Sequence, residues 1–398
     1  MLNTKHKIYK LLIVVSMIFF LFPCCKAAEN SDLYGIVWNM VNDDYIDSTK
    51  NGQDWDYWKL RYQNKLLSND DSYIAIDSML KSLNDEHTKF LRPKQFNDVK
   101  KELSLLSVGI GVILEKKEGK ILVKKVLSGS TAEKKGLKIN EQIVSVDDKN
   151  VCELNEKDVY RLLKGKRNTF VKITIKSNDD KLKTYKIKRD IVKTKSISNI
   201  VPENNILDEN IGYIRIKAFA GTDIVADFKN ELKKNKNKKG LIIDIRNNLG
   251  GLFDETIKMS DLLLPKNKII VKTLKSDGKE NIIFSKNRQY YKGNIVILTN
   301  KMTVSAAEIF AGALADNKSA IILGEQTYGK GYIQEIKNIP PYKAGLCLTV
   351  EKYKTPNGSD INEKGITPQI YIKQTSGNTD KNTDVQLQEA QKILLKTN

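Results

Sequence analysis

The sequence has 398 residues, 40% of them hydrophobic and 29% charged, which is too long for one hydrophobic core and typical of two or three soluble domains. The formal net charge is +19, but the Lys residues are dispersed without an Arg-rich or aromatic-interleaved stripe, so we expect no nucleic-acid partner. The four Cys form no CxxC pair and the two His are His6 and His87, so we expect no metal site, no disulfide framework and no cofactor.

Residues 1–28 have the pattern of a targeting segment. Three Lys residues precede the apolar run 11–25, and small residues follow at Ala27 and Ala28. The run is short for a membrane span of about 20 residues. The pattern predicts export across the cytoplasmic membrane, with either a cleaved secretory signal or a retained signal-anchor that holds the protein at the membrane.

Residues 29–103 are expected to form a helical N-terminal region. Apolar residues recur at helical spacing in 31–47, and further helices are predicted over 54–67 and 71–83. A turn-rich connection, NDEHTKFLRPKQF, follows over 84–96.

Residues 104–190 change to the alternating pattern of strands, which predicts a separate small β-rich domain with two helices. The expected strands are 107–114, 120–127, 169–177 and 183–190, and 141–151 is expected to be a strand followed by a DDKN turn. The helices lie within 128–137 and 156–165.

Strands and helices alternate over 191–375, which indicates an α/β core with a mainly parallel or mixed sheet. The expected order is strand 211–219, helix 222–234, strand 240–246, helix 252–264, strand 294–300, helix 305–317 and strand 320–325. The apolar run GLIIDIR (240–246) is typical of a strand buried on both faces. A C-terminal tail, 376–398, contains an amphipathic helix over 384–395. The chain is therefore expected to be a multidomain α+β protein.

The segment NIVILTNKMTVSAAEIFAGALAD (294–316) places Ser305 where a helix begins after a buried strand. Open α/β sheets carry their sites at this strand end, and the N–H of Ala306 is a helix N-terminal donor that can hold an oxyanion. A serine here can equally serve only as a helix N-cap, and this segment alone leaves both roles open.

The segment GEQTYGKGYIQ (324–334) places Lys330 between Gly329 and Gly331. A lysine acts as a base only when burial lowers its pKa far below about 10.4. A nucleotide-binding P-loop is excluded because Gly331 stands where that motif needs Ser or Thr. His87 is the one histidine after residue 28, and we expect it to have a structural part in the 84–96 connection. Ser305 and Lys330 are therefore the best nucleophile–base pair in the chain.

The segment DIRNNLGG (244–251) follows a predicted buried strand and ends in Gly250 and Gly251. A glycine N–H at such a turn can supply a second oxyanion donor, and the same glycines suit a tight strand-to-helix turn.

In this order, these segments resemble the C-terminal processing peptidases, also called tail-specific proteases. TNKMTVSAAEIFAGALAD (299–316), GEQTYGKGYIQ and YKTPNGSDINEKGITP (353–368) are similar to family motifs, as is DIRNNLGG with Leu249 in place of Pro. The resemblance implies a core of the crotonase-like (ClpP/crotonase) type. It also implies that Ser305 is the nucleophile, that Lys330 is the base and that Gln334 orients the lysine amine.

Residues 104–190 resemble a PDZ domain, with Asn140 and Glu141 in place of the usual Gly-Asp pair. The SVGIGVIL segment (107–114) supplies a carboxylate-binding loop of Gly109, Ile110, Gly111 and Val112. The resemblance implies that a peptide C-terminus binds this loop and adds as a β-strand.

The expected function is that of a serine endopeptidase which captures polypeptides with exposed apolar C-terminal tails and cleaves them through an acyl-enzyme, with oxyanion donors from Ala306 and Gly250 or Gly251. The helical N-terminal region and the last helix are candidates for a homodimer contact. Two alternatives stay open: a PDZ adaptor whose peptidase domain is inactive or gated by a partner, and a thioester-acting enzyme on the crotonase-like scaffold.

Overall fold

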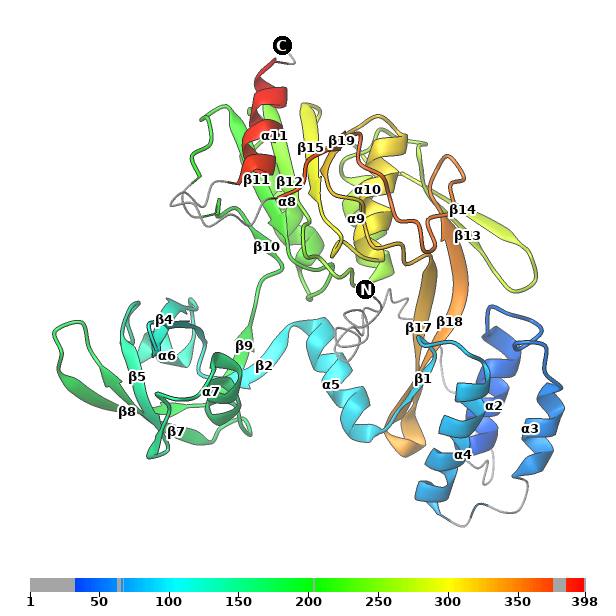
Figure 1. Ribbon diagram of the computed structural model, residues 1–398, viewed down its shortest axis with the longest axis horizontal. Helices are drawn as coiled ribbons and strands as arrows, with labels where there is room; N and C mark the ends of the chain where they lie inside the picture. Colours follow the sequence, from blue (N-terminus) through cyan, green and yellow to red (C-terminus); the bar gives the residue numbers. More distant parts are fainter. Residues whose placement is uncertain (1–32, 63–65, 67, 203–204, 375–383, 397–398) are drawn as a thin grey trace. The chain divides into compact units, whose positions relative to one another are not determined.

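The computed structural model describes residues 33–62, 66, 68–202, 205–374 and 384–396 (Figure 1). The predicted targeting segment 1–28 lies outside the described residues. The chain divides into two compact units, one formed by Lys101–Thr194 and the other by Met1–Lys100 together with Lys195–Asn398. The helical N-terminal region thus belongs to the same compact unit as the α/β core, which the sequence did not predict.

The larger unit contains most of the helices and two sheets. Its helices are α2 (Leu33–Asp44), α3 (Trp55–Arg61), α4 (Asn69–Ser82), α8 (Ile224–Lys234), α9 (Phe253–Asp261), α10 (Ala306–Asp316) and α11 (Val385–Lys396), with a 3₁₀ turn, η2 (Pro340–Tyr342). Its strands are β1 (Lys89–Leu91), β10 (Ile197–Ser198), β11 (Ile211–Ile216), β12 (Gly240–Asp244), β13 (Ile269–Leu274), β14 (Glu280–Phe284), β15 (Asn294–Thr299), β16 (Ile321–Gly324), β17 (Tyr332–Ile339), β18 (Ala344–Lys354) and β19 (Ile370–Tyr371). Helix α5 (Pro93–Ser104) leads into the smaller unit.

The central sheet has the order β10-β11-β12-β15-β16-β19, and all neighbours except β10 and β11 are parallel. Strand β12 is buried on both faces, as the apolar run predicted. Its Leu241 and Ile243 face the core formed with α8, α9 and α10, whereas Ile242 packs with Leu387 and Leu394 of α11. Because parallel strands end at one edge, the segments after β12, β15 and β16 leave the sheet side by side.

The second sheet joins the N-terminal region to the core. Its order is β1-β18-β13-β14, and β17 also pairs with β18. Helices α2, α3 and α4 pack on this sheet through a cluster that includes Trp38, Ile76 and Leu346. Strand β1, which lies inside the connection expected to be turn-rich, pairs antiparallel with β18. The segment before β1 is therefore held beside β18.

The smaller unit is a β-rich domain with its own core. Its elements are β2 (Leu106–Gly109), β3 (Val112–Lys117), β4 (Lys120–Val126), α6 (Thr131–Lys134), β5 (Gln142–Val146), β6 (Lys149–Asn150), α7 (Glu156–Leu163), β7 (Phe170–Lys176), β8 (Leu182–Lys188) and β9 (Asp190–Lys193). The main sheet has the order β3-β4-β5-β7-β8 with β6 beside β5, and β2 pairs with β9. Buried residues such as Ile121, Ile143 and Ile173 fill the core of this domain.

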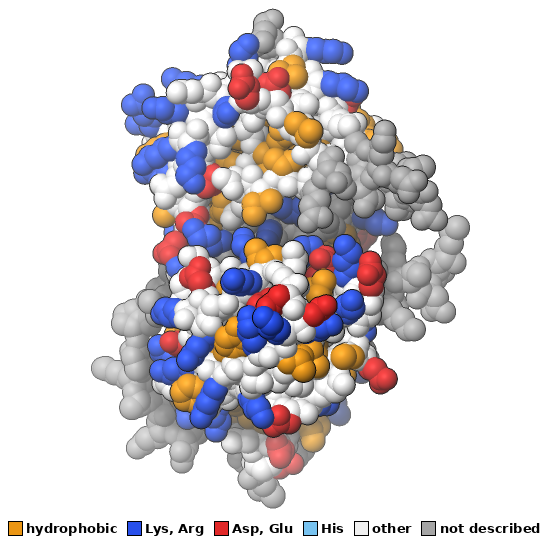
Figure 2. Space-filling view, turned by 90° about the vertical axis from the view of Figure 1, so that its left-hand side faces the viewer, with side chains coloured by type: hydrophobic (Ala, Val, Ile, Leu, Met, Phe, Trp, Pro, Cys, Tyr) orange, Lys and Arg blue, Asp and Glu red, His pale blue; other side chains and the backbone are white. Residues whose placement is uncertain are grey.

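The surface charge is dispersed on the face shown in Figure 2, where Lys and Arg side chains are interspersed with acidic and uncharged ones. Within the described ranges, no helix combines the length and the apolar character that a membrane span needs.

Candidate active site

Ser305 occupies a sharp turn between the central sheet and a helix. Strand β15 ends at Thr299, and Ser305 is the residue directly before α10. Its φ is +58° and its ψ is −121°, a conformation that costs a residue with a side chain about 1–3 kcal/mol. The residue is fully buried, with 0% exposure. Surrounding contacts must therefore hold the serine in this strained geometry.

The buried carboxylate of Glu308 supplies those contacts. Its Oε2 accepts hydrogen bonds from the backbone N–H groups of Ser305 (2.7 Å) and Lys330 (3.0 Å). Its Oε1 accepts from the Thr327 hydroxyl (2.5 Å) and the Gly329 N–H (2.7 Å). Burial raises the pKa of Glu308, and these hydrogen bonds oppose that rise. One side chain thus ties the serine turn to the lysine loop.

The lysine loop depends on glycine at a position of close approach. Gly329 has a φ of +91°, and a Cβ there would lie 2.7 Å from the Gly365 backbone N. The hydroxyl of Tyr353 donates to the Lys330 carbonyl at 2.6 Å and lies 3.3 Å from the Ser305 carbonyl. Lys330 is 6% exposed, and burial lowers the pKa of its amine to about 8. A neutral amine is therefore accessible near neutral pH.

The third segment, 244–251, is held against the serine turn by Asn248. The Asn248 carbonyl accepts from the Val304 N–H (3.0 Å), and its Oδ1 accepts from the Gly250 N–H (2.8 Å). Gly250 and Gly251 both have positive φ, and a Cβ on Gly251 would lie 2.3 Å from the Phe219 carbonyl oxygen. The Gly250 N–H is already engaged by Asn248, so Gly251 and Ala306 are the better candidates for oxyanion donors.

Gln334 lies on β17 and is fully buried. Its Nε2 lies 3.4 Å from the hydroxyl of Thr349, its partner on β18. Among the described residues, its buried Oε1 has no hydrogen-bond partner. This buried oxygen can still accept a hydrogen bond. Gln334 follows Lys330 by four residues in the chain.

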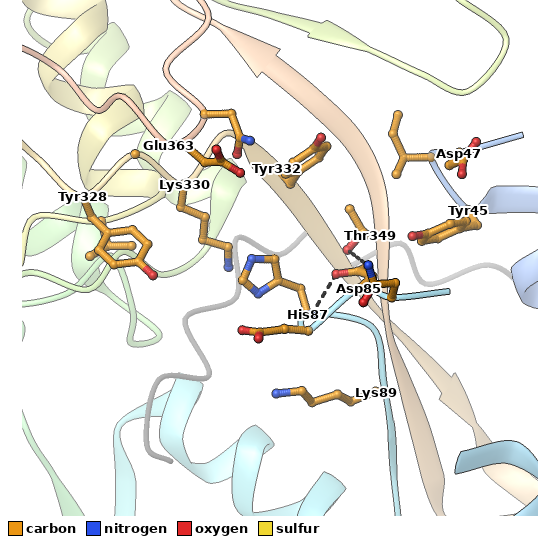
Figure 3. Close-up of a pocket in the computed structure, with 16 residues that line it drawn as sticks. Tyr45, Asp47, Asp85, His87, Lys89, Tyr328, Lys330, Tyr332, Thr349 and Glu363 are labelled. Atoms are coloured by element: carbon orange, nitrogen blue, oxygen red, sulfur yellow. Dashed lines mark hydrogen bonds between the residues drawn. The ribbon is translucent and has the colours of Figure 1, made fainter. Parts of the chain in front are cut away.

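A cavity of about 980 Å³ opens beside Lys330 and is also lined by Val304, Tyr332 and Thr349. His87, for which the sequence favoured a structural part, lines the same cavity. Figure 3 shows the amine end of Lys330 pointing toward the His87 ring, with Asp85 beyond that ring. Burial and the Lys330 charge lower the pKa of His87 to about 4, so its imidazole is neutral at physiological pH.

The proposed peptide-binding loop lies in the smaller unit, between β2 and β3. Gly111 has a φ of +86°, and a Cβ there would lie 2.2 Å from the Ser130 Cβ. The Ile110 carbonyl accepts from the Ala132 N–H at 2.9 Å, which fixes the loop against α6. Glycine is thus required at the centre of this loop.

The outer edge of β3 is occupied by side chains of α7. The Leu114 N–H donates to the Tyr160 hydroxyl (2.6 Å), and the Lys116 N–H donates to the Glu156 carboxylate (2.7 Å). Leu114 and Lys116 are two residues apart and so present their N–H groups to the same edge. Tyr160 and Glu156 are four apart and share one helix face. These donors are the ones that an added strand would use.

Within the described residues, no group of three or more His, Cys, Asp or Glu side chains is arranged to hold a metal ion. Cys152 and Cys347 are both free thiols. Burial raises the pKa of the Cys347 thiol to about 12, so this side chain is not a thiolate at neutral pH.

Residues 210–372 match peptidase family S41, and residues 122–177 match a PDZ domain. The chain is 33% identical over 355 residues to a carboxyl-terminal-processing protease of Picosynechococcus sp., covering 87% of this chain and 84% of that protein. The chain belongs to the carboxyl-terminal-processing proteases of family S41. These are serine proteases, which confirms the expected family, the expected enzyme class and the presence of a PDZ domain.

Two further relatives agree with this membership of family S41. The carboxy-terminal processing protease CtpA of Bacillus subtilis is 33% identical over 319 residues, covering 79% of this chain and 66% of that protein. The structure of the photosystem II D1 C-terminal processing protease matches with a TM-score of 0.57 and 28% identity, covering 86% of this chain and 92% of that one. Both matches extend over more than three quarters of this chain.

Sequence reasoning missed two groups around the candidate dyad. Glu308 stands three residues after Ser305, and Ser-x-x-Glu is the capping-box pattern that would have linked these two residues. Asp85 and His87 gave no comparable signal, because their approach to β18 depends on pairing between segments far apart in the chain.

Glu308→Gln should disrupt the site with almost no change in volume. The amide would turn an NH₂ group toward donors that now share a carboxylate oxygen, so we expect a loss of about 2–4 kcal/mol in the free energy of unfolding. Urea denaturation followed by circular dichroism measures this loss. Glu255→Gln on α9, where the carboxylate pairs with Lys258, is the control and should change stability little. Equal stability of the two variants would contradict the role of Glu308.

Proposed function

We propose that this protein is an exported endopeptidase that cleaves peptide bonds with Ser305 as nucleophile and Lys330 as base. Its PDZ domain captures exposed apolar C-terminal tails through the loop Gly109–Val112. Family membership supports the class of reaction. The assignment of roles to these residues rests on the strained serine that Glu308 ties to a buried lysine of lowered pKa.

The reaction has two halves. Neutral Lys330 accepts the Ser305 hydroxyl proton as the serine oxygen bonds to the peptide carbonyl carbon, and the oxyanion is held by the N–H groups of Ala306 and Gly251. The lysine then gives the proton to the leaving amine, which leaves an acyl-enzyme. Water attacks this ester as the same lysine takes its proton, and the lysine then gives that proton to the departing Ser305 oxygen, which restores the serine and the neutral amine. Gln334 orients the lysine amine through its carboxamide oxygen.

The decisive experiment compares the parent protein with Ser305→Ala and Lys330→Ala. The substrate is an unfolded protein with an apolar C-terminal tail, and a copy with a charged tail serves as control. The parent should cleave the apolar-tailed substrate, and each variant should lower the rate by at least about a thousandfold, because nucleophile and base act as one unit. Full cleavage by Ser305→Ala would refute the assignment of the nucleophile.

The rate of acylation should rise with pH. Lys330 must be neutral to accept a proton, and burial sets the pKa of its amine at about 8, so the rate should reach half its plateau near pH 8. Stopped-flow measurement of Ser305 acylation by an activated ester gives this profile. Lys330→Arg, which keeps the charge but cannot lose its proton, should be inactive throughout. A midpoint near about 6.5 would instead implicate a histidine of ordinary pKa.

Peptide binding by the PDZ domain must compete with contacts inside that domain. An added strand needs the Leu114 and Lys116 N–H groups, which now donate to Tyr160 and Glu156. We infer that a tail peptide displaces these side chains from the β3 edge as it binds. The binding free energy of the peptide is then reduced by the cost of breaking the contacts of Tyr160 and Glu156 with the β3 edge, and the apparent affinity falls accordingly.

Tyr160→Phe should therefore tighten binding of a tail peptide by about threefold to tenfold, since it removes one competing hydrogen bond. Fluorescence anisotropy with a labelled peptide measures the dissociation constant, and the same peptide with an amidated C-terminus should bind poorly. Tyr185→Phe on β8 is the matched control and should leave affinity unchanged. Weaker binding by Tyr160→Phe would show that the tyrosine contacts the ligand rather than competing with it.

A second candidate function, a PDZ binding protein whose peptidase is active only when a partner engages it, is favoured by one observation. Ser305 is fully buried, so its hydroxyl must become accessible before it can attack a peptide. The cleavage assay separates the two: a gated enzyme binds the tail peptide but cleaves only after a specific partner is added.

A further inference from the structure

The loop before β1 carries a carboxylate that collects three hydrogen bonds. Asp85 accepts from the Thr88 hydroxyl (2.6 Å) and the Thr349 hydroxyl (2.7 Å) through Oδ2, and from the His87 backbone N–H (2.8 Å) through Oδ1. Asp85, His87 and Thr349 all line the cavity that contains Lys330. The carboxylate therefore fixes two neighbours of the proposed base at once.

The first branch leads through Thr349 to Gln334. Because the Thr349 hydroxyl donates its proton to Asp85, its oxygen can only accept from the Gln334 Nε2, which lies 3.4 Å away. This assigns the NH₂ group of the amide to the Thr349 side and turns the Gln334 Oε1 away from it. That oxygen is buried without a partner among the described residues, which leaves it as an acceptor for a donor such as the lysine amine.

The second branch leads through the backbone to the His87 ring. Asp85 holds the His87 N–H, and the ring lies between Asp85 and the end of Lys330 (Figure 3). Burial is the largest cause of the low pKa of His87. The charges of Lys330 and Lys89 also favour the neutral ring, whereas those of Asp85 and Glu86 oppose it. A neutral imidazole adds no charge next to the base.

We propose that Asp85 is a positioning residue for Lys330, acting through Thr349 on the Gln334 amide and through the backbone of His87 on its imidazole ring. In this role Asp85 acts through its hydrogen-bond partners and not on the reacting atoms. In this role its carboxylate orients the Gln334 amide oxygen and the neutral His87 ring, and these two groups in turn orient the lysine amine. This inference rests on the proposed Ser305–Lys330 chemistry.

The substitutions that test it separate orientation from charge. Thr349→Val keeps the volume but removes the hydroxyl that links Asp85 to Gln334, and Thr349→Ser restores that hydroxyl. Asp85→Asn removes the charge, which now raises the pKa of Lys330, and offers an amide where two hydroxyls need an acceptor. Misorientation of a base lowers the acylation plateau by about tenfold to a hundredfold. Asp85→Asn should also move the midpoint of the profile to lower pH.

The experiment labels Ser305 in the full chain with a small fluorophosphonate between about pH 6 and pH 10, a range that brackets the titration of Lys330. The proteins are the parent, Ser305→Ala, Asp85→Asn, Thr349→Val, Thr349→Ser and, as control, Asp70→Asn at the exposed start of α4. Thermal unfolding of each variant shows that it is folded at the assay temperature. A small probe avoids any effect on the capture of a long substrate.

The proposal expects a lowered plateau for Asp85→Asn and Thr349→Val, a lowered midpoint for Asp85→Asn alone, and parental behaviour for Thr349→Ser and Asp70→Asn. It is overturned if Asp85→Asn and Thr349→Val react like the parent, or if Thr349→Ser is as impaired as Thr349→Val. If the parent is labelled no faster than Ser305→Ala, the proposed function itself fails, and the role of Asp85 falls with it.

Discussion

The geometry of the candidate site depends on the Glu308 carboxylate, which accepts hydrogen bonds from both the serine turn and the lysine loop. Ser305 adopts a positive φ that an isolated chain would rarely populate, and Lys330 sits in a loop bent at Gly329. Neither geometry would persist alone. A buried acceptor with donors on both sides makes the two loops one structure, because freeing either removes hydrogen bonds from a carboxyl group in the interior.

Burial has opposite effects on the ionisable groups around this carboxylate. It lowers the pKa of Lys330 and of His87, which favours the neutral amine and the neutral ring, and it raises the pKa of the Cys347 thiol. Burial also raises the pKa of Glu308, although the hydrogen bonds that both of its oxygens accept oppose that rise. The interior thus contains a base that is half neutral near pH 8 and an acidic side chain that serves as a structural anchor.

Local sequence pattern predicted the central sheet but not the second one. The runs that form β12 and β15 are apolar except at their ends, and the periodicity of residues 305–317 matches α10, because burial on a parallel sheet leaves a strong signal in each segment. Strands β17 and β18 carry mixed polar residues, including Gln334, Thr349 and Glu351, and gave no such signal. The contact of Asp85 with Thr349 spans 264 residues, so no local pattern can show it.

The residues of the candidate site also differ in whether a local sequence pattern predicts them. The motif-bearing residues Ser305, Lys330 and Gly251 come from loops at one edge of the parallel sheet, and such an edge can be recognised in a sequence from the strands that precede it. Asp85 and His87, which line the cavity beside Lys330, come instead from the segment before β1, which is held at the core by the pairing of β1 with β18. The sequence therefore reveals the groups that would react, and its Ser-x-x-Glu pattern includes Glu308, whereas the approach of Asp85 and His87 emerges only from the tertiary fold. This explains why His87 was assigned a purely structural part from its sequence position, although its ring lies beside the proposed base.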